Sequence, residues 1–340
     1  MGAPFCPHPS VFHERKMMPL PVTYQHVLEA LPRVHNILRP TLLRQWSGLS
    51  KLTECSFYLK HENHQPIGAF KVRGGVNLAS TLSEDERLAG LVAVSTGNHG
   101  QSLAFASSRV GVTCTIVVPR GNNPGKNEAM RGLGAILIEQ GKDYDEAKSY
   151  VEKTLLKENG GRYVHSVNEP ALISGVGTMA WEIFQDLPDP DVILVPIGLG
   201  SGVCSTAIVA KYLRPKTQII GVQADGAPSV VNTWKTGQWT TTESVSTFAE
   251  GIATRVPAEM TMQIMQELMD DALLVSDDDM HQAIGHLLMH THNLAEGSGA
   301  ASLAAAIRYK DRFQGKKVVG IFSGGNLDLK ELPRILSSLK

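Results

Sequence analysis

The chain has almost no excess of charge and no long hydrophobic run, and each absence excludes a class of protein. Its 340 residues carry a formal net charge of -1, so the basic surface that nucleic acids and anionic membranes require is missing. The longest apolar runs, such as Val192–Val195 and Val318–Phe322, are far too short to cross a bilayer. Residues 1–20 mix Pro, His, Glu and Lys without a continuous apolar core, so we expect a flexible extension there and no secretory signal.

Cysteine is also scarce, and the few cysteines lack the spacing of a metal site. The sequence contains four of them: Cys6, Cys55, Cys114 and Cys204. Cys114 and Cys204 lie among apolar or small residues, which indicates reduced core thiols and favours a cytoplasmic protein. Among the 12 histidines, His286 and His290 are close together, but on a helical pattern without a carboxylate at ligand spacing. We therefore predict no metal centre.

Short β-branched segments alternate with helical patterns along almost the whole chain. Strands are predicted at Phe57–Lys60, Leu91–Val94, Thr115–Val118, Ala135–Ile138, Val192–Pro196, Ile219–Gln223 and Val318–Phe322. Helices are predicted at Gly100–Arg109, Asp143–Lys157, Ala171–Gln185, Ser201–Leu213, Asp277–His290, Gly299–Tyr309 and Leu329–Leu339. Apolar strands separated by helices indicate parallel sheets covered on both faces, which is an α/β fold. Because the composition never shifts sharply, two domains would share the chain by insertion of one into the other.

Four loops at the ends of these strands contain residues suited to chemistry. In the first, Pro66–Gly75, Lys71 lies among glycine, aromatic and small apolar residues. A lysine that loses its hydration becomes neutral enough to react with a carbonyl group. Taken alone, however, a lysine near a helix start is far more often solvated than reactive. The other loops decide between these two interpretations.

Each of the other three loops suits a different ligand group. Ser95–Gly100 follows a strand and opens a helix, so it is either an anion-binding turn or an ordinary helix cap. Gly198–Gly202 brings backbone N–H groups to the start of a helix, which favours a phosphate. Its spacing is neither a dinucleotide fingerprint nor a P-loop, so a small phosphorylated cofactor is favoured over a nucleotide. Ser323–Asn326 places a hydroxyl where it could hydrogen-bond a heteroaromatic nitrogen.

In this order, the four loops resemble those of the fold-type II pyridoxal-phosphate (PLP) enzymes, in particular the threonine dehydratase and serine racemase group. Pro66–Gly75 is similar to that group's cofactor-lysine motif, with Ala69 where serine is usual, and Ser95–Gln101 to its S-x-G-N-H-x-Q loop. Ala249–Ala253 resembles its A-D-G-I-A segment, and Glu296–Ala305 its glutamate-led helix. The resemblance extends over nearly the whole chain. It implies a tryptophan synthase β-like fold, with PLP in the cleft between two open parallel-sheet domains.

The resemblance also implies a role for each loop residue. Lys71 would bind PLP covalently and later carry the α-proton of the substrate, and Phe70 would pack near the cofactor ring. Asn98 would hydrogen-bond the phenolic oxygen of the cofactor, and Ser323 would face its pyridine nitrogen. The phosphate would be held by the residues that replace the group's tetraglycine-leucine loop: Gly198, Leu199, Gly200, Ser201 and Gly202. The substrate carboxylate would be surrounded by Ser95, Thr96, Asn98 and His99, with Glu296 as a further candidate.

The implied reaction is α,β-elimination of water from a β-hydroxy amino acid such as L-threonine or L-serine, giving a 2-oxo acid and ammonia. Racemisation is the nearest alternative, but it needs a second base, and Thr96 stands where racemase-like sequences have serine. The acidic positions of the racemase cation site correspond here to Gln223 and Ser229, so no metal is predicted. A β-replacement enzyme and a catalytically silent binding protein fit less well, the latter because the lysine, asparagine and serine are all retained.

By the same resemblance, the chain divides into a large PLP-binding domain, residues 21–87 and 168–340, and a small inserted domain, residues 88–167. The resemblance further implies a homodimer whose ligand is a small amino acid, without nucleic-acid or membrane partners. The Gly198–Gly202 loop and Gln223–Gly226 are most similar to dehydratases linked to hydroxyectoine breakdown. Which β-hydroxy amino acid is used stays open at this point.

Overall fold

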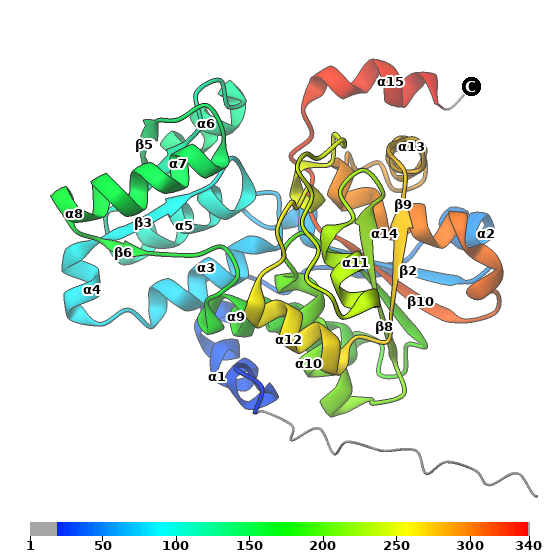
Figure 1. The fold of residues 1–340 in the computed structure, drawn as a ribbon. Helices are drawn as coiled ribbons and strands as arrows, with labels where there is room; N and C mark the ends of the chain where they lie inside the picture. Colours follow the sequence, from blue (N-terminus) through cyan, green and yellow to red (C-terminus); the bar gives the residue numbers. More distant parts are fainter. Residues whose placement is uncertain (1–18, 339–340) are drawn as a thin grey trace, which may run out of the picture.

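The described residues of this computed structural model, 19–338, are organised around two β-sheets of different size (Figure 1). The larger sheet has six strands in the order β1-β2-β10-β7-β8-β9, and the smaller has four in the order β5-β4-β3-β6. The strands are β1 (Leu43–Gln45), β2 (Ser56–His61), β3 (Leu91–Val94), β4 (Cys114–Val118), β5 (Ile136–Glu139), β6 (Arg162–Tyr163), β7 (Val192–Pro196), β8 (Gln218–Ala224), β9 (Asp271–Val275) and β10 (Lys317–Phe322). All strands of the smaller sheet therefore fall between β2 and β7 of the larger one.

Parallel pairing dominates both sheets. In the smaller sheet, β3 runs parallel to β4 and β6, and β4 runs parallel to β5. In the larger sheet, β1 pairs antiparallel with β2 at the edge, and the other pairs are parallel. Every residue of the apolar strand β7 is buried, as expected for a central parallel strand with helices on both faces.

Helices cover both faces of each sheet (Figure 1). They are α1 (Tyr24–His35), α2 (Ser47–Thr53), α3 (Lys71–Ser80), α4 (Glu84–Ala89), α5 (Asn98–Val110), α6 (Pro124–Gly132), α7 (Tyr144–Tyr150), α8 (Leu156–Asn159), α9 (Pro170–Asp186), α10 (Ser201–Leu213), α11 (Ser229–Thr236), α12 (Glu259–Leu268), α13 (Asp277–Thr291), α14 (Gly297–Arg308) and α15 (Leu332–Ser337). One core joins the larger sheet to α2, α13 and α14, and a second joins its other face to α9, α10 and α12.

The smaller sheet lies between α5 and α6 on one side and α7 with the residues after it on the other. We call this sheet with helices α5 to α8 the small lobe, and the larger sheet with its helices the large lobe. Helix α3 packs against α5 of the small lobe and α9 of the large lobe. The start of α3 therefore lies where the two lobes meet.

The predicted elements are present, with small differences at their ends. Each of the seven predicted strands is found within one residue of its expected bounds, and the helix predicted at Ser201–Leu213 has those bounds. The helix predicted at Asp143–Lys157 contains a π-helical turn at Val151–Leu155. The last predicted helix is a 3₁₀ turn at Leu329–Glu331 followed by α15, and its predicted end, Leu339, lies outside the described residues.

Two other expectations concern the surface and the core. Within residues 19–338, none of the helices combines the length and hydrophobicity needed to cross a membrane. Cys114 and Cys204 are buried free thiols, as predicted, and Cys55 is buried as well. Cys6 and most of the predicted N-terminal extension fall outside the described residues.

Candidate active site

Lys71 is the first residue of α3, and contacts at both its ends fix its position. Its Nζ donates a hydrogen bond to Ser201 Oγ at 2.8 Å, at the start of α10. Its backbone carbonyl accepts a hydrogen bond from Ser102 Oγ of α5 at 2.7 Å. Burial lowers the pKa of Lys71 to about 8, because the ammonium form loses its hydration there. The lysine is therefore held between the lobes in a state closer to the reactive neutral amine.

The turn before Lys71 is fixed by the loop that follows β10. Gly68 has a φ of 70°, and a Cβ atom there would lie 2.8 Å from Asn326 Oδ1, so glycine is required on both grounds. Ala69 and Gly324 form an antiparallel bridge, and the Phe70 N–H donates to the Ser323 carbonyl at 3.1 Å. Two loops far apart in the sequence thus form one wall of the site.

The glycine-rich loop Gly198–Gly202 connects β7 to α10, as predicted. Gly200 adopts a φ of 105°, and a Cβ atom on Gly198 would lie 2.3 Å from the carbonyl oxygen of Gly251. Only glycine fits these positions, so the backbone stays close to the space above it. The first N–H groups of α10 have no partner within the helix and carry partial positive charge. The loop is suited to an anion such as a phosphate.

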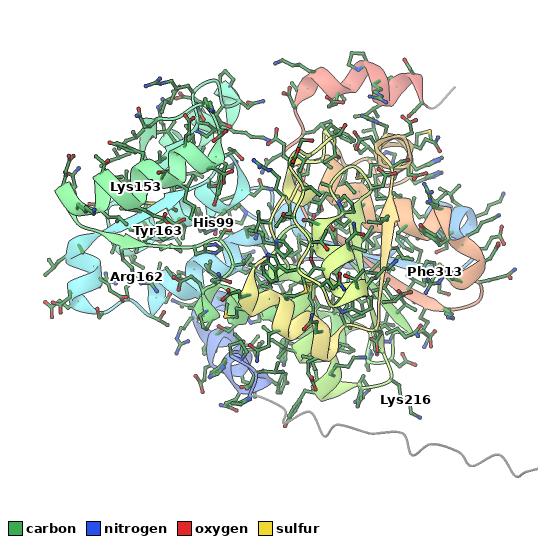
Figure 2. The ribbon with its side chains drawn as sticks, in the orientation of Figure 1. His99, Lys153, Arg162, Tyr163, Lys216 and Phe313 are labelled. Carbon is green, nitrogen blue, oxygen red and sulfur yellow. The ribbon has the colours of Figure 1, made fainter. Side chains whose placement is uncertain are left out.

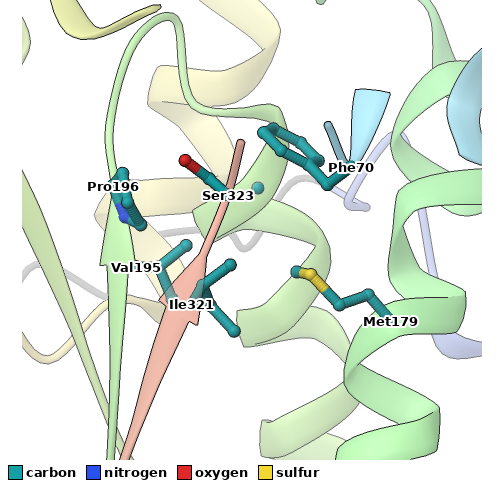
Figure 3. A pocket seen from close by; sticks show the side chains of 7 residues that line it. Phe70, Met179, Val195, Pro196, Ile321 and Ser323 are labelled. Carbon is teal, nitrogen blue, oxygen red and sulfur yellow. The ribbon is translucent and has the colours of Figure 1, made fainter. Parts of the chain in front are cut away.

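Ser323 lies at the end of β10, beside a small pocket (Figure 3). The pocket is lined by Phe70, Met179, Val195, Pro196, Gly202, Ile321 and Ser323. Figure 3 shows Phe70 and Ser323 at its upper rim, with Ile321 and Met179 beneath them. The serine residue is only 4% exposed and supplies a hydroxyl in a mostly apolar wall.

The loop Ser95–Gly100 leads from β3 into α5 and contains a buried histidine. Ser95 Oγ accepts hydrogen bonds from the N–H groups of Gly97 at 3.3 Å and Gly100 at 2.9 Å, which fixes the turn. His99 is buried, and its Nε2 has no hydrogen-bond partner among the described residues. Burial, reinforced by the charge of Lys71, lowers the pKa of His99 to about 3, so the ring is neutral. Figure 2 labels His99 on the side of the small lobe that faces the large lobe.

Asn98 is held by two side chains from the large lobe. Its Nδ2 donates to Glu296 Oε1 at 2.8 Å, and its Oδ1 accepts from Asn326 Nδ2 at 2.7 Å. Ser298 Oγ donates to the same Glu296 oxygen at 2.9 Å. Burial raises the pKa of Glu296, although Ser298, Lys126 and Asn98 oppose that shift. Glu296 therefore orients Asn98, and one N–H of the Asn98 amide is left for a ligand.

The predicted site residues thus meet at one place, at the C-terminal ends of β3, β7 and β10. The model of the pyridoxal-phosphate dependent enzyme family matches residues 34–324 of this chain. The chain belongs to this family.

Similar proteins agree with that assignment. The L-threonine ammonia-lyase of Thermotoga maritima is 36% identical over 316 residues, which span 93% of this chain and 78% of that protein. The solved structure of the processed form of threonine deaminase isoform 2 from Solanum lycopersicum has a TM-score of 0.87 at 32% identity, with 93% of this chain and 92% of that chain covered. A maize serine racemase structure has a TM-score of 0.87 at 28% identity, covering 94% and 98%.

The residues of the site fit the cofactor of the PLP family. The lowered pKa of the Lys71 amine makes it reactive toward an aldehyde such as that of PLP. The glycine loop Gly198–Gly202 at the start of α10 suits the PLP phosphate. A pyridine ring bears one nitrogen in an otherwise apolar face, which matches a pocket of apolar side chains with one serine. PLP supplies a conjugated system that accepts the electron pair released from the substrate Cα.

At the positions of the racemase cation site, the chain makes hydrogen bonds with neutral side chains. Gln223 Oε1 accepts from the N–H of Val231 at 3.0 Å, and Ser229 Oγ donates to the carbonyl of Thr254 at 2.6 Å. Over residues 19–338, no three His, Cys, Asp or Glu side chains form a group suited to a metal ion. The rings of His286 and His290 instead stack with their centres 5.9 Å apart.

Three residues near the site were not predicted to belong to it: Lys126, Glu250 and Asn326. Lys126 Nζ donates to Glu250 Oε2 at 2.6 Å, which joins α6 of the small lobe to the segment before Gly251. Lys126 and Asn326 also line a cavity of about 340 Å³ beside Gln101. The sequence offered a signal for Asn326, which ends the Ser323 loop, and for Glu250, which lies in the family-like Ala249–Ala253 segment. Lys126 carried no comparable signal.

Proposed function

We propose that this protein is a PLP-dependent dehydratase, or ammonia-lyase, that removes water from a β-hydroxy amino acid such as L-threonine or L-serine. The products are a 2-oxo acid and ammonia. The observation that carries the proposal is the position of Lys71, whose pKa is lowered to about 8 and whose Nζ lies 2.8 Å from Ser201 Oγ at the anion-binding start of α10. The similarity to proteins named L-threonine ammonia-lyase and threonine deaminase supports the same reaction.

Lys71 is the catalytic residue of this proposal. Its Nζ would hold the cofactor through the aldehyde and, once free of it, would take the α-proton of the substrate as a general base. A lowered pKa suits this second role, because a lysine that is charged at working pH cannot accept a proton. Phe70 would pack beside the cofactor ring, and the remaining N–H of the Asn98 amide would be available to the cofactor's phenolic oxygen.

The rest of the site binds and orients. The backbone N–H groups of Gly198–Gly202, with the Ser201 hydroxyl, would hold the phosphate. The loop Ser95–His99, with Thr96 and Asn98, binds the substrate carboxylate at the start of α5, where the helix dipole favours an anion. Ser323 would offer its hydroxyl to the pyridine nitrogen without protonating it. Glu296 acts mainly by orienting Asn98, as its hydrogen bond to the Asn98 amide supports.

We also propose a division of the chain and a setting for it. Residues 21–87 and 168–340 form the PLP-binding domain, and residues 88–167 form a small domain that closes over the substrate. The position of the smaller sheet between β2 and β7 supports this division. We further propose a cytoplasmic homodimer, to be checked by sedimentation equilibrium of the purified protein.

A substrate panel tests the proposed reaction. Purified protein loaded with PLP is incubated with L-threonine, L-serine, 3-hydroxyaspartate and phenylserine, and 2-oxo acid and ammonia are measured. We expect equal amounts of both products with at least one substrate. Negligible rates with the whole panel, despite a visible absorption band from bound cofactor, would contradict the dehydratase.

Racemisation is the second candidate, and one observation favours keeping it. Thr96 keeps a hydroxyl in the substrate loop, at the position expected for the second base, and the chain is similar to a maize serine racemase. Incubation of L-serine with the enzyme, followed by chiral chromatography, distinguishes the two reactions. D-serine formed faster than pyruvate would make racemisation the main activity.

A further inference from the structure

Arg73, two residues after Lys71, belongs to a cluster of buried charged side chains to which the proposed reaction gives no role. The cluster consists of Lys60, Glu62, Arg73 and Glu182, whose side chains are at most 3% exposed. Burying charges is costly unless each one is paired and hydrogen-bonded. Each of these four groups is therefore expected to have a partner of opposite charge.

Arg73 is the centre of the cluster, and all five of its N–H donors have acceptors. Its Nε and Nη2 donate to the two oxygens of Glu62, at 2.7 and 2.8 Å. Its Nη1 and Nη2 donate to the two oxygens of Glu182, at 2.6 and 2.8 Å. The remaining Nη1 hydrogen reaches Thr178 Oγ1 at 3.0 Å. The planar guanidinium thus makes two bidentate pairs, one with each carboxylate, and these fix both its position and its orientation.

The charges within the cluster balance. Lys60 Nζ donates to Glu182 Oε2 at 2.6 Å and to the Thr41 carbonyl at 2.7 Å, so two cations face two carboxylates. Although burial opposes it, the two carboxylates raise the pKa of Arg73 above its usual value. In the same way, Arg73 and Lys60 outweigh burial and lower the pKa of Glu182. Arg73 and Glu182 therefore stay charged. We call Arg73 with its two carboxylate partners, Glu62 and Glu182, the clamp.

The clamp acts on the turn that carries Lys71. Phe70, which precedes α3, provides no side-chain cap for the helix, so other contacts must fix its first turn. Residues two apart in a helix point about 200° from each other around its axis, so Arg73 and Lys71 leave α3 on nearly opposite sides. The ion pairs of Arg73 with Glu62 and Glu182, on the side of α3 opposite Lys71, therefore fix the rotation of this turn about the helix axis. Since Glu62 precedes the loop to Gly68, the same pair also closes the segment that leads into Lys71.

We propose that Arg73 is a positioning residue for Lys71: its double grip on Glu62 and Glu182 sets the rotation of α3 and holds Lys71 Nζ at the start of α10. The inference rests on the proposed function, because Lys71 is the group that it positions. A lysine at position 73 would keep the charge but lose the planar fork, so charge and positioning can be separated.

Three variants test the clamp: Arg73→Lys, Thr178→Val and the control Thr291→Val. Thr178→Val removes one acceptor of Arg73 without changing any charge. Thr291 is also a buried helix threonine, but it lies on α13, and its hydroxyl bonds the Leu287 carbonyl, at 2.6 Å, rather than a member of the cluster. Each PLP-loaded variant is compared with the unaltered enzyme by melting temperature, by kcat and KM for the best substrate, and by visible circular dichroism of the bound cofactor.

We expect Arg73→Lys to lower kcat roughly ten- to hundredfold, the size of effect that follows displacement of a reacting group by about 1 Å. KM should change by less than about threefold, because the carboxylate loop is untouched. The visible circular dichroism should change with kcat, since it reports how the lysine holds the cofactor. Thr178→Val should shift both measurements in the same direction by less. Thr291→Val should leave both unchanged even if its melting temperature falls.

Two results would overturn the proposal. One is a folded Arg73→Lys variant with unaltered kcat and visible circular dichroism, which would leave the cluster a structural role only. The other is an unaltered Thr178→Val variant, which decides the question if Arg73→Lys does not fold. If the unaltered protein eliminates water from no β-hydroxy amino acid, the proposed function fails, but the circular dichroism needs no substrate and still tests the clamp.

Discussion

Burial lowers the pKa of Lys71 to about 8, against 10.5 for an ordinary lysine. At pH 7 the uncharged fraction of the amine is then on the order of one tenth, which is hundreds of times more than for a solvated lysine. Neither the neighbouring charges nor a base is needed for this effect, because burial is its cause. The Phe70 ring, with its centre 5.3 Å from the amine, and Ser201 of the glycine loop, at 2.8 Å, lie beside it.

This shift predicts how cofactor binding depends on pH. Only the neutral amine attacks an aldehyde, so the rate at which cofactor-free protein captures PLP should rise with pH and level off above about 8. Stopped-flow absorbance after mixing with PLP measures the rate. A rate still rising steadily up to the ordinary lysine value of 10.5 would show that the amine is not desolvated.

Replacing Lys71 should abolish the reaction while the protein stays folded. For Lys71→Ala we expect 2-oxo acid formation to fall roughly 10³-fold or more, since both the covalent link and the base are lost. The exposed Lys235 on α11 gives a matched control, and Lys235→Ala should keep full activity. Residual activity of Lys71→Ala within about tenfold of the unaltered enzyme would assign the base to another residue.

Glu296 should matter through Asn98 rather than through its charge. Glu296→Ala leaves the Asn98 N–H without its acceptor, and an unpaired buried donor costs about 1–3 kcal/mol. We expect kcat/KM to fall roughly tenfold or more. Glu296→Gln keeps an acceptor oxygen and should fall less. Equal losses in the two variants would point instead to a need for the carboxylate charge.

At the level of secondary structure, the elements predicted from the sequence were those with a strong local hydrophobic pattern. The apolar, β-branched strands β7 and β10 were found almost to the residue, because parallel strands buried on both faces are continuous apolar runs. The strands β1, β6 and β9 were not predicted, and all three lie at sheet edges. Two of them, β1 and β6, have only three and two residues, too few for a recognisable pattern. Helix α3 was missed as an element because Gly74 and Gly75 weaken its helical pattern.

Those two glycines have a packing reason that sequence cannot supply. A Cβ atom on Gly75 would lie 2.4 Å from Ser102 Oγ of α5, and one on Gly74 would lie 2.8 Å from the Leu172 carbonyl of α9. The helix that carries Lys71 is therefore pressed between a helix of each lobe. Arg73 was not predicted to have a role near the site, because a charged side chain in a sequence is normally taken as exposed.

The glycine loop allows a direct test at this scale. Gly198→Ala would place its Cβ 2.3 Å from the Gly251 carbonyl, so the loop must move. Overpacking of this kind costs about 1–3 kcal/mol, and we expect the Kd for PLP to rise by about tenfold or more. A Cβ on Gly132 of α6 would meet nothing within 4 Å, so Gly132→Ala should bind PLP normally. An unchanged Kd in Gly198→Ala would remove this loop from the cofactor site.

Across the whole molecule, polar pairs connect the two lobes around the site. Lys126 bonds Glu250, Asn123 Nδ2 donates to Asp328 Oδ2 at 3.0 Å, and Arg255 pairs with Asp145 at 3.1 Å. The Asn98–Glu296 bond lies further inside. The site is therefore complete only when the two lobes are in contact. Local sequence patterns do not reveal these contacts between the lobes.

This arrangement predicts that Lys126 affects substrate binding. Lys126→Met should raise KM several-fold with a smaller change in kcat, because an open small lobe binds substrate less well but can still close. Arg131 makes a similar pair with Glu139 at 3.2 Å within the small lobe, so Arg131→Met is the control and should keep KM. Steady-state kinetics on both variants decides the matter. Equal effects of the two changes would show that loss of charge, not contact between lobes, raises KM.

The order of strands in the larger sheet has a consequence for how the protein is made. The strand β10 lies between β2 and β7, yet it is the last strand of the described chain. A ribosome-bound chain that lacks it would hold two unjoined halves of the sheet with exposed edges, which are prone to mispairing. The bridge from Ala69 to Gly324 would also be missing. Lys71 is thus synthesised long before β10, and its surroundings form only once β10 has been made.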